Sequence, residues 1–251
     1  MFQMKRELTA NAIKLAAILA MLLDHIAWLF LQTQSVPGFL MHLAGRITAP
    51  IMCFFVQEGY VHTRNVRRYA TRLALFATVS YLPYILFSTG DLPTLDTALN
   101  FNVIYTLLLS LAALYVWDKV TPTGLKLFLL FGLCLLATLG DWSYFAILFT
   151  LAFYLGRGNF SRQAKTFSFV GALWWLSCIF LYLSAYVGQE MPLSEVLCRI
   201  GMQAGVFLCL PLLSLYHGKR GGGKYSGWFF YIFYPLHLLI LFAIAWMVNP
   251  G

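Results

Sequence analysis

Long uninterrupted runs of apolar residues dominate the hydrophobic pattern of this chain. Seven of the runs are long enough for a helix to cross the ~30 Å of hydrocarbon in a bilayer. They lie near residues 12–31, 39–61, 70–88, 102–117, 166–187, 196–215 and 226–248. Two shorter runs, 125–139 and 142–156, indicate either two short crossings or a re-entrant hairpin. Counted as crossings, they bring the prediction to about nine transmembrane helices.

The composition supports a membrane protein. Of the 251 residues, 61% are hydrophobic and only 10% are charged, whereas a soluble domain carries about 25% charged residues. The excess of apolar surface must therefore face lipid. Continuous runs rather than alternating ones argue against a membrane β-barrel. We expect an all-α, polytopic integral membrane helical bundle, with residues 1–251 forming a single domain.

The net charge of +8 is explained by topology. With nine crossings, the Lys and Arg residues between spans all lie on one side. The loops on the other side, 32–38, 89–101, 140–141 and 188–195, contain neither. Because basic loops stay in the cytoplasm, the N-terminus is predicted to be cytoplasmic. No nucleic-acid partner is needed to explain the charge.

The five cysteines are scattered through apolar segments without a CxxC pair. This pattern predicts small buried side chains, and neither a disulfide framework nor a metal site is expected.

A few ionisable residues fall inside the predicted spans, where each costs at least ~2.5 to 3.5 kcal/mol without a partner. Arg199 can pair with Glu195 one helical turn earlier. Arg46 can neutralise Asp24 across a helix contact, which would be a structural role. His25 is a candidate proton acceptor, because imidazole titrates near neutrality, although a buried histidine can also be purely structural.

A second group of basic residues lies at the cytoplasmic ends of the first two spans. Lys14 precedes His25 by eleven residues, about three helical turns or ~16 Å, on nearly the same face. Four arginines, Arg64, Arg67, Arg68 and Arg72, follow the second span. Guanidinium groups suit phosphate recognition. The same cluster could instead form a basic collar on anionic membrane lipid.

Several motifs resemble the TraX family, the membrane acetylases of pilins and related fimbrial proteins. The motifs are Met21–His25, Gly45–Pro50, Glu58–Asn65, Asn102–Leu109 and Tyr231–His237. More distantly, the spacing of Lys14 and His25 resembles the acyltransferase-3 group. Proteins of that group usually have ten or more spans, at least one more than is counted here.

The resemblance implies an acetyltransferase of the bacterial inner membrane that uses cytosolic acetyl-CoA. It implies His25 as the catalytic residue. In such a reaction the adjacent carboxylate of Asp24 can hold the tautomer of His25, and Arg46 or the hydroxyl of Tyr60 can stabilise the oxyanion. Residues implied to bind CoA are Lys14, Arg64, Arg67, Arg68 and Arg72. Other candidates for the pocket are Glu58, Tyr60, His62, Asn102, Tyr234 and His237. The acceptor would be the N-terminal amine of a pilin or a group on an envelope glycan.

Two non-enzymatic functions compete with this interpretation. A transporter would also keep ionisable residues in its spans, but it would commonly show an internal repeat, and none is visible. A structural partner in pilus assembly would need no histidine in a span. Saturable binding of CoA separates the enzyme from both alternatives.

Overall fold

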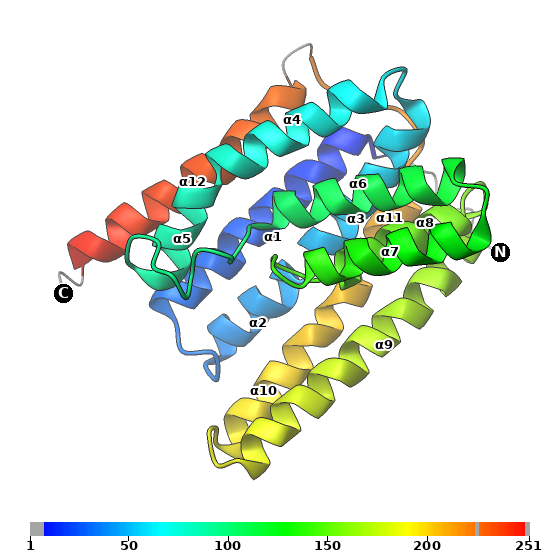
Figure 1. Ribbon diagram of the computed structural model, residues 1–251. Coiled ribbons are helices and arrows are strands. Elements are labelled where there is room, and N and C mark those ends of the chain that lie inside the picture. Colours follow the sequence, from blue (N-terminus) through cyan, green and yellow to red (C-terminus); the bar gives the residue numbers. More distant parts are fainter. Residues whose placement is uncertain (1–7, 224–225, 249–251) are drawn as a thin grey trace. The chain divides into compact units, whose positions relative to one another are not determined.

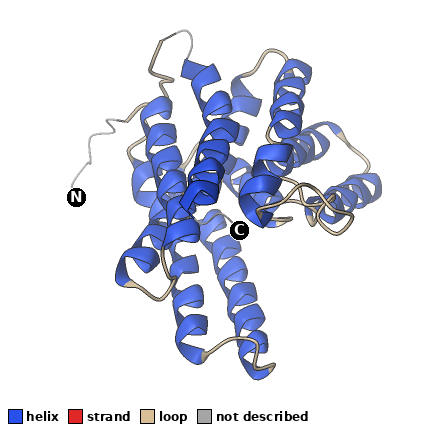
Figure 2. Cartoon of the chain, turned by 90° about the vertical axis from the view of Figure 1, so that its left-hand side faces the viewer, coloured by secondary structure: helices blue, strands red, loops and turns tan. Residues whose placement is uncertain are grey.

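The computed structural model describes residues 8–223 and 226–248, and these residues form helices joined by loops. Throughout these two ranges there is no strand beyond isolated bridges such as Phe101 with Gly140 (Figure 2). The all-α prediction is therefore confirmed. The chain divides into two compact units. Unit 1 comprises residues 1–52 and 158–226, and unit 2 comprises 53–157 and 227–251. The single domain predicted from the sequence stays a prediction.

Unit 1 is built from the helices of two separate chain segments. They are α1 (Ala10–Phe30), α2 (Val36–Gly45), the start of α3 (Thr48–His62), α9 (Phe160–Val187), α10 (Leu193–Gln203), the 3₁₀ helix η1 (Ala204–Leu208) and α11 (Cys209–Ser214). Thr9 caps α1 and Ser35 caps α2. The two helices run antiparallel, since Thr48 just beyond α2 bonds the carbonyl of Ala17 on α1.

Unit 2 is arranged around α6 (Val103–Lys119). Its other helices are the rest of α3, α4 (Val66–Val79), α5 (Tyr81–Thr89), α7 (Thr123–Ala137), α8 (Phe145–Leu155) and α12 (Ser226–Val248). α6 packs against α4, α7 and α8, with a core of Leu109, Ala113, Ala137 and Ile147. α12 lies beside α4 (Figure 1), where the rings of Phe76 and Tyr231 stack 4.8 Å apart.

Each predicted apolar run corresponds to one helix or to consecutive helices. In the described part of the chain, five helical segments are long and apolar enough to cross a membrane: 10–30, 36–62, 160–187, 193–214 and 227–248. The run 70–88 instead forms α4 and α5, which are bent by 41° at their junction, and counting this pair as one span gives six. α7 and α8 are shorter apolar helices. A multi-spanning helical protein is shown, whereas the number nine is not confirmed.

Candidate functional site

A carboxylate, an imidazole and a guanidinium meet between α1 and α2. One oxygen of Asp24 bonds Nδ1 of His42 at 2.7 Å, and the other accepts a hydrogen bond from Nη2 of Arg46 at 2.8 Å. Asp24 is 8% exposed and His42 is fully buried. The predicted neutralisation of Asp24 by Arg46 is therefore confirmed. We call these three side chains the Asp24 cluster.

The spacing of His42 and Arg46 explains why both reach one carboxylate. Residues four apart share a helix face, and this face of α2 lies against α1. Gly45 makes the approach possible, because a Cβ atom there would overlap Cβ of Asp24. On the other side, a Cβ on Gly205 would overlap the carbonyl oxygen of Leu43. The two glycines thus allow the helices around the cluster to pack closely.

Asp24 fixes the proton on the imidazole of His42. An ionised carboxylate can only accept a hydrogen bond, so Nδ1 of His42 donates the proton in this contact. No partner for Nε2 occurs among the described residues. The ring of Trp28 packs against the imidazole, with centroids 4.4 Å apart. Since His42 has no exposed surface, a substrate cannot contact it in this conformation, and its evident role is to hold Asp24.

His25 differs from His42 in being only half-buried. It follows Asp24 on α1, so its side chain projects about 100° away from that of Asp24. A neighbouring anion stabilises the positive charge that an imidazole gains on taking up a proton. His25 is therefore the accessible imidazole beside a carboxylate that is held in place by other partners.

Arg199 lies at the edge of this region of unit 1. Its guanidinium is 5.6 Å from the ring centroid of Trp28. It also forms an ion pair with Glu195 at 2.7 Å, which confirms the pair predicted from the sequence. Arg199 is thus explained by contacts within unit 1.

Lys14 lies at the end of unit 1 where α1 begins. The backbone N–H of Ala10 donates to the carbonyl of Lys219, and that of Asn11 donates to the carbonyl of Arg220. The half-buried Lys14 is one turn along α1, and its charge interacts with that of Arg220. Basic residues distant in sequence therefore meet at one end of unit 1, as the charge pattern predicts for a cytoplasmic face.

In unit 2, Asp118 joins the C-terminal ends of three helices. It accepts hydrogen bonds from Tyr60 on α3 at 2.8 Å and from Tyr154 on α8 at 3.2 Å. Lys119 pairs with it at 2.9 Å. The hydrogen bonds from Lys119 and Tyr60 hold the pKa of Asp118 below its usual range. Tyr60 was predicted from the sequence, whereas Asp118 was missed. Asp118 could have been found as an acidic residue in an otherwise basic region.

The four arginines, Arg64, Arg67, Arg68 and Arg72, are all exposed at the start of α4. Asn65 caps this helix by accepting a hydrogen bond from the backbone N–H of Arg68 at 2.9 Å. Arg68 and Arg72 are one turn apart and share a face. Exposed guanidiniums with this spacing can contact phosphate oxygens.

Hydrogen bonds within unit 2 account for two further pocket candidates, His62 and Asn102. Nδ1 of His62 lies 2.9 Å from the carbonyl oxygen of Glu58. Asn102 caps α6, accepting from the N–H of Ile104 at 3.0 Å and donating to the carbonyl of Ala77 at 2.8 Å.

On α12, Nδ1 of His237 lies 2.9 Å from the carbonyl oxygen of Phe233. The rings of Phe233 and His237 stack with their centroids 4.8 Å apart. Tyr234 is buried beside them, its ring 5.6 Å from that of His237. These contacts satisfy polar groups inside an apolar helix, and they suggest a structural role for His237.

The sequence-predicted residues are divided between the units. Lys14, Asp24, His25 and Arg46 belong to unit 1, and the others belong to unit 2. The five cysteines are free thiols. Across residues 8–223 and 226–248, no three His, Cys, Asp or Glu side chains are grouped to hold a metal ion.

Comparison with known proteins identifies a family and a relative of this chain. Residues 9–245 match the family described as TraX protein. The chain is 35% identical over 242 residues to the "Probable fimbrial assembly protein FimC, serogroup H1" of Dichelobacter nodosus. The match covers 94% of this chain and 95% of that protein. No solved structure matches the chain. Taken with the apolar helices, the nearly complete family match shows that this chain belongs to the TraX family.

Proposed function

We propose that the chain is an acetyltransferase of the bacterial inner membrane. It takes an acetyl group from cytosolic acetyl-CoA and transfers it to an extracytoplasmic acceptor. The acceptor is the N-terminal amine of a pilin, or an amine or hydroxyl of an envelope glycan. Family membership and the fimbrial assembly protein among its relatives support this setting. The observation that carries the proposal is the half-buried His25 beside the tightly held carboxylate of Asp24.

The reaction requires one group that moves a proton near neutral pH, which is the chemistry of imidazole. The acceptor nitrogen or oxygen attacks the thioester carbonyl carbon while His25 takes its proton. The tetrahedral intermediate then collapses, the carbon–sulfur bond breaks, and the thiolate of CoA leaves and takes up a proton. Direct transfer needs no covalent acyl-enzyme.

The Asp24 cluster supports this step electrostatically. Asp24 stays ionised because His42 and Arg46 both bond to it, and it stabilises the imidazolium that forms on His25. The guanidinium of Arg46 donates to Asp24 through Nη2. A donor aimed at the thioester oxygen would stabilise the developing negative charge. We assign Arg46 that part.

The phosphates of CoA require cations outside the hydrocarbon. Arg68 and Arg72 are exposed, share one face and lie at the polar end of unit 2. They can bind phosphate oxygens in pairs through their planar forks. The roles of Lys14, Arg64 and Arg67 toward CoA remain predictions from the resemblance.

The test uses the full chain, purified in detergent, with isotope-labelled acetyl-CoA. We expect saturable CoA binding and transfer of label to a peptide that carries a free pilin-like N-terminus. Mass spectrometry of pilins and surface glycans, with and without the gene, identifies the natural acceptor. If the folded protein shows no saturable CoA binding, the proposal fails and a non-enzymatic role in pilus assembly replaces it.

A further inference from the structure

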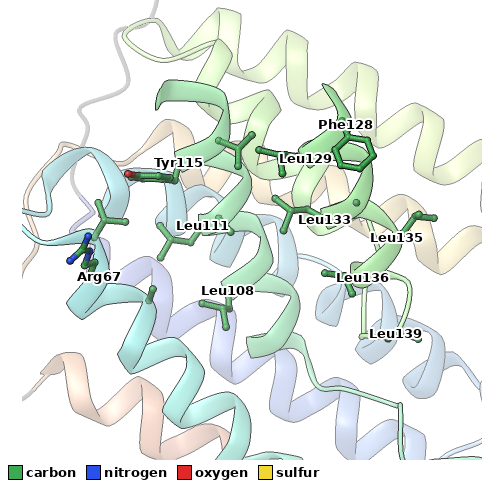
Figure 3. A pocket seen from close by; sticks show the side chains of 15 residues that line it. Arg67, Leu108, Leu111, Tyr115, Phe128, Leu129, Leu133, Leu135, Leu136 and Leu139 are labelled. Carbon is green, nitrogen blue, oxygen red and sulfur yellow. The ribbon is translucent and has the colours of Figure 1, made fainter. Parts of the chain in front are cut away.

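An apolar groove runs along the surface of unit 2 between α4, α6 and α7 (Figure 3). Its volume is about 870 Å³. α6 contributes Leu108 and Leu111, and α7 contributes Leu129, Leu133 and Leu136. Apart from Arg67, none of the candidate site residues described above lines this groove, so its apolar lining calls for a different occupant.

The groove has one cationic end. Of the described residues that line it, Arg67 alone carries a charge, and its side chain is exposed. Arg67 is in the first turn of α4, and Tyr115 lies near the last turn of α6 (Figure 3). This is the end of α6 where Asp118 joins the polar network. The opposite end is lined by Leu136 and Leu139. An occupant must therefore be apolar along its length and anionic at the end near Arg67.

The length of the groove matches one leaflet of a bilayer. From Leu108 to Val116 on α6, eight residues rise ~12 Å. Half of the hydrocarbon core of a bilayer is ~15 Å. The groove also opens outward, since Phe128 is 72% and Leu136 is 49% exposed on α7. A chain lying in it would be continuous with the surrounding lipid.

We propose that this groove binds one acyl chain of an anionic glycerophospholipid of the cytoplasmic leaflet, with the phosphate at Arg67. The pantetheine arm of CoA is a poorer match, because its amides would be buried against leucines without hydrogen-bond partners. Arginine suits a phosphate because its planar fork can donate two parallel hydrogen bonds. The proposal does not depend on acetyl transfer.

Headgroup recognition must supply the selectivity of such a site. An acyl chain that moves from bulk hydrocarbon into the groove gains packing contacts but no hydrophobic driving force. The charge of Arg67 distinguishes an anionic headgroup from a zwitterionic one. Arg67 thereby serves the lipid, whereas Arg68 and Arg72, which do not line the groove, remain available to CoA.

Gly132 offers a direct way to fill the groove. It lines the cavity on α7, and a Cβ atom there would meet nothing within 4 Å. Gly132→Leu therefore places a side chain into open space rather than against the backbone. Gly124 is also open and lies on the same helix outside the groove, so Gly124→Leu is a matched control. Ala112→Phe blocks the groove from α6 should Gly132→Leu not fold.

Native mass spectrometry of the delipidated full chain tests the proposal, with dioleoyl phosphatidylglycerol and dioleoyl phosphatidylcholine as probes. We expect the wild type to bind phosphatidylglycerol about fivefold more tightly, the effect of one arginine beside an anionic lipid. Arg67→Gln should erase the preference, and Arg64→Gln should keep it. Gly132→Leu or Ala112→Phe should lose the bound lipid, and Gly124→Leu should retain it. Equal binding of both lipids by the wild type, or unchanged retention in a folded groove-filled variant, would overturn the proposal.

Discussion

Asp24 on α1 and His42 on α2 are joined by a 2.7 Å hydrogen bond inside an apolar helix pair. The imidazole is fully buried, so this contact holds a carboxylate rather than exposing a base. Arg46 completes the pairing of that carboxylate. His25, the next residue on α1, is half-buried, and its side chain projects about 100° away from that of Asp24.

The first prediction concerns His25. His25→Ala should insert and fold normally but lose acetyl transfer by at least about a hundredfold, a typical contribution of general acid–base catalysis. The measurement is the rate of label transfer from acetyl-CoA by the purified variant. His217→Ala, in a loop of the same unit, is the control and should keep nearly the full rate. Undiminished turnover in His25→Ala would remove the proposed proton acceptor.

His42 should behave as a positioning residue. His42→Leu removes a donor from buried Asp24, so the free energy of unfolding should fall by about 1 to 3 kcal/mol. His42→Gln retains an N–H donor and should keep more stability and most activity. Unfolding in detergent and the transfer rate are measured together. If stable His42→Gln is as inactive as His25→Ala, then His42 is the proton acceptor and our assignment is wrong.

Gly45 should tolerate no side chain. In Gly45→Ala, the added methyl group overlaps Asp24, and overpacking of this kind costs about 1 to 3 kcal/mol. The thermal midpoint in detergent should fall, and activity should fall with it as Asp24 is displaced. Gly124→Ala, where space is open, should leave the midpoint unchanged or raise it. Equal midpoints for the two variants would contradict close packing at the Asp24 cluster.

The guanidinium geometry of Arg68 and Arg72 should matter for acetyl-CoA. Arg68→Lys or Arg72→Lys should raise the KM for acetyl-CoA, because lysine keeps the charge but loses the fork. Loss of one charged phosphate contact corresponds to a weakening of roughly tenfold to a hundredfold. Arg162→Lys, an exposed arginine outside the cluster, should have no effect.

Dephospho-CoA gives the finer test of the same arginines. An arginine that touches the 3′-phosphate should lose its effect on affinity when that phosphate is absent. If CoA binds equally to the wild type and to Ala variants at all four arginines, none of the four contacts CoA.

The helical architecture was predictable because spans are set by residue composition over long runs. The runs 12–31 and 226–248 appear almost unchanged as α1 and α12. The run 70–88 was predicted as a single span, but it is divided between α4 and α5. Ser80 ends α4 and precedes α5, and Pro83 lies in the first turn of α5, where its missing N–H costs no hydrogen bond. Hydropathy does not register such a local break.

The candidate site was predictable only in part, because hydropathy identifies polar residues but not their partners. Asp24 and Arg46 stood out as charges in apolar runs. His42 was missed, although its spacing four residues before Arg46 placed it on the same face. Asn102 was placed in a pocket because of its motif, yet its amide caps a helix. A polar residue at a helix start has this simpler explanation.

The pairing of Asp24 with two residues of the next helix has a consequence for membrane insertion. Alone, the first helix would carry an uncompensated carboxylate into hydrocarbon, and the following segment would carry an uncompensated cation, each at a cost of at least ~2.5 kcal/mol. Joined as an antiparallel hairpin by a short loop, the two segments cancel these charges within themselves. It is therefore energetically preferable for the two segments to leave the translocation machinery together rather than one by one. The Asp24 cluster thus favours insertion of this part of the protein as a helical pair.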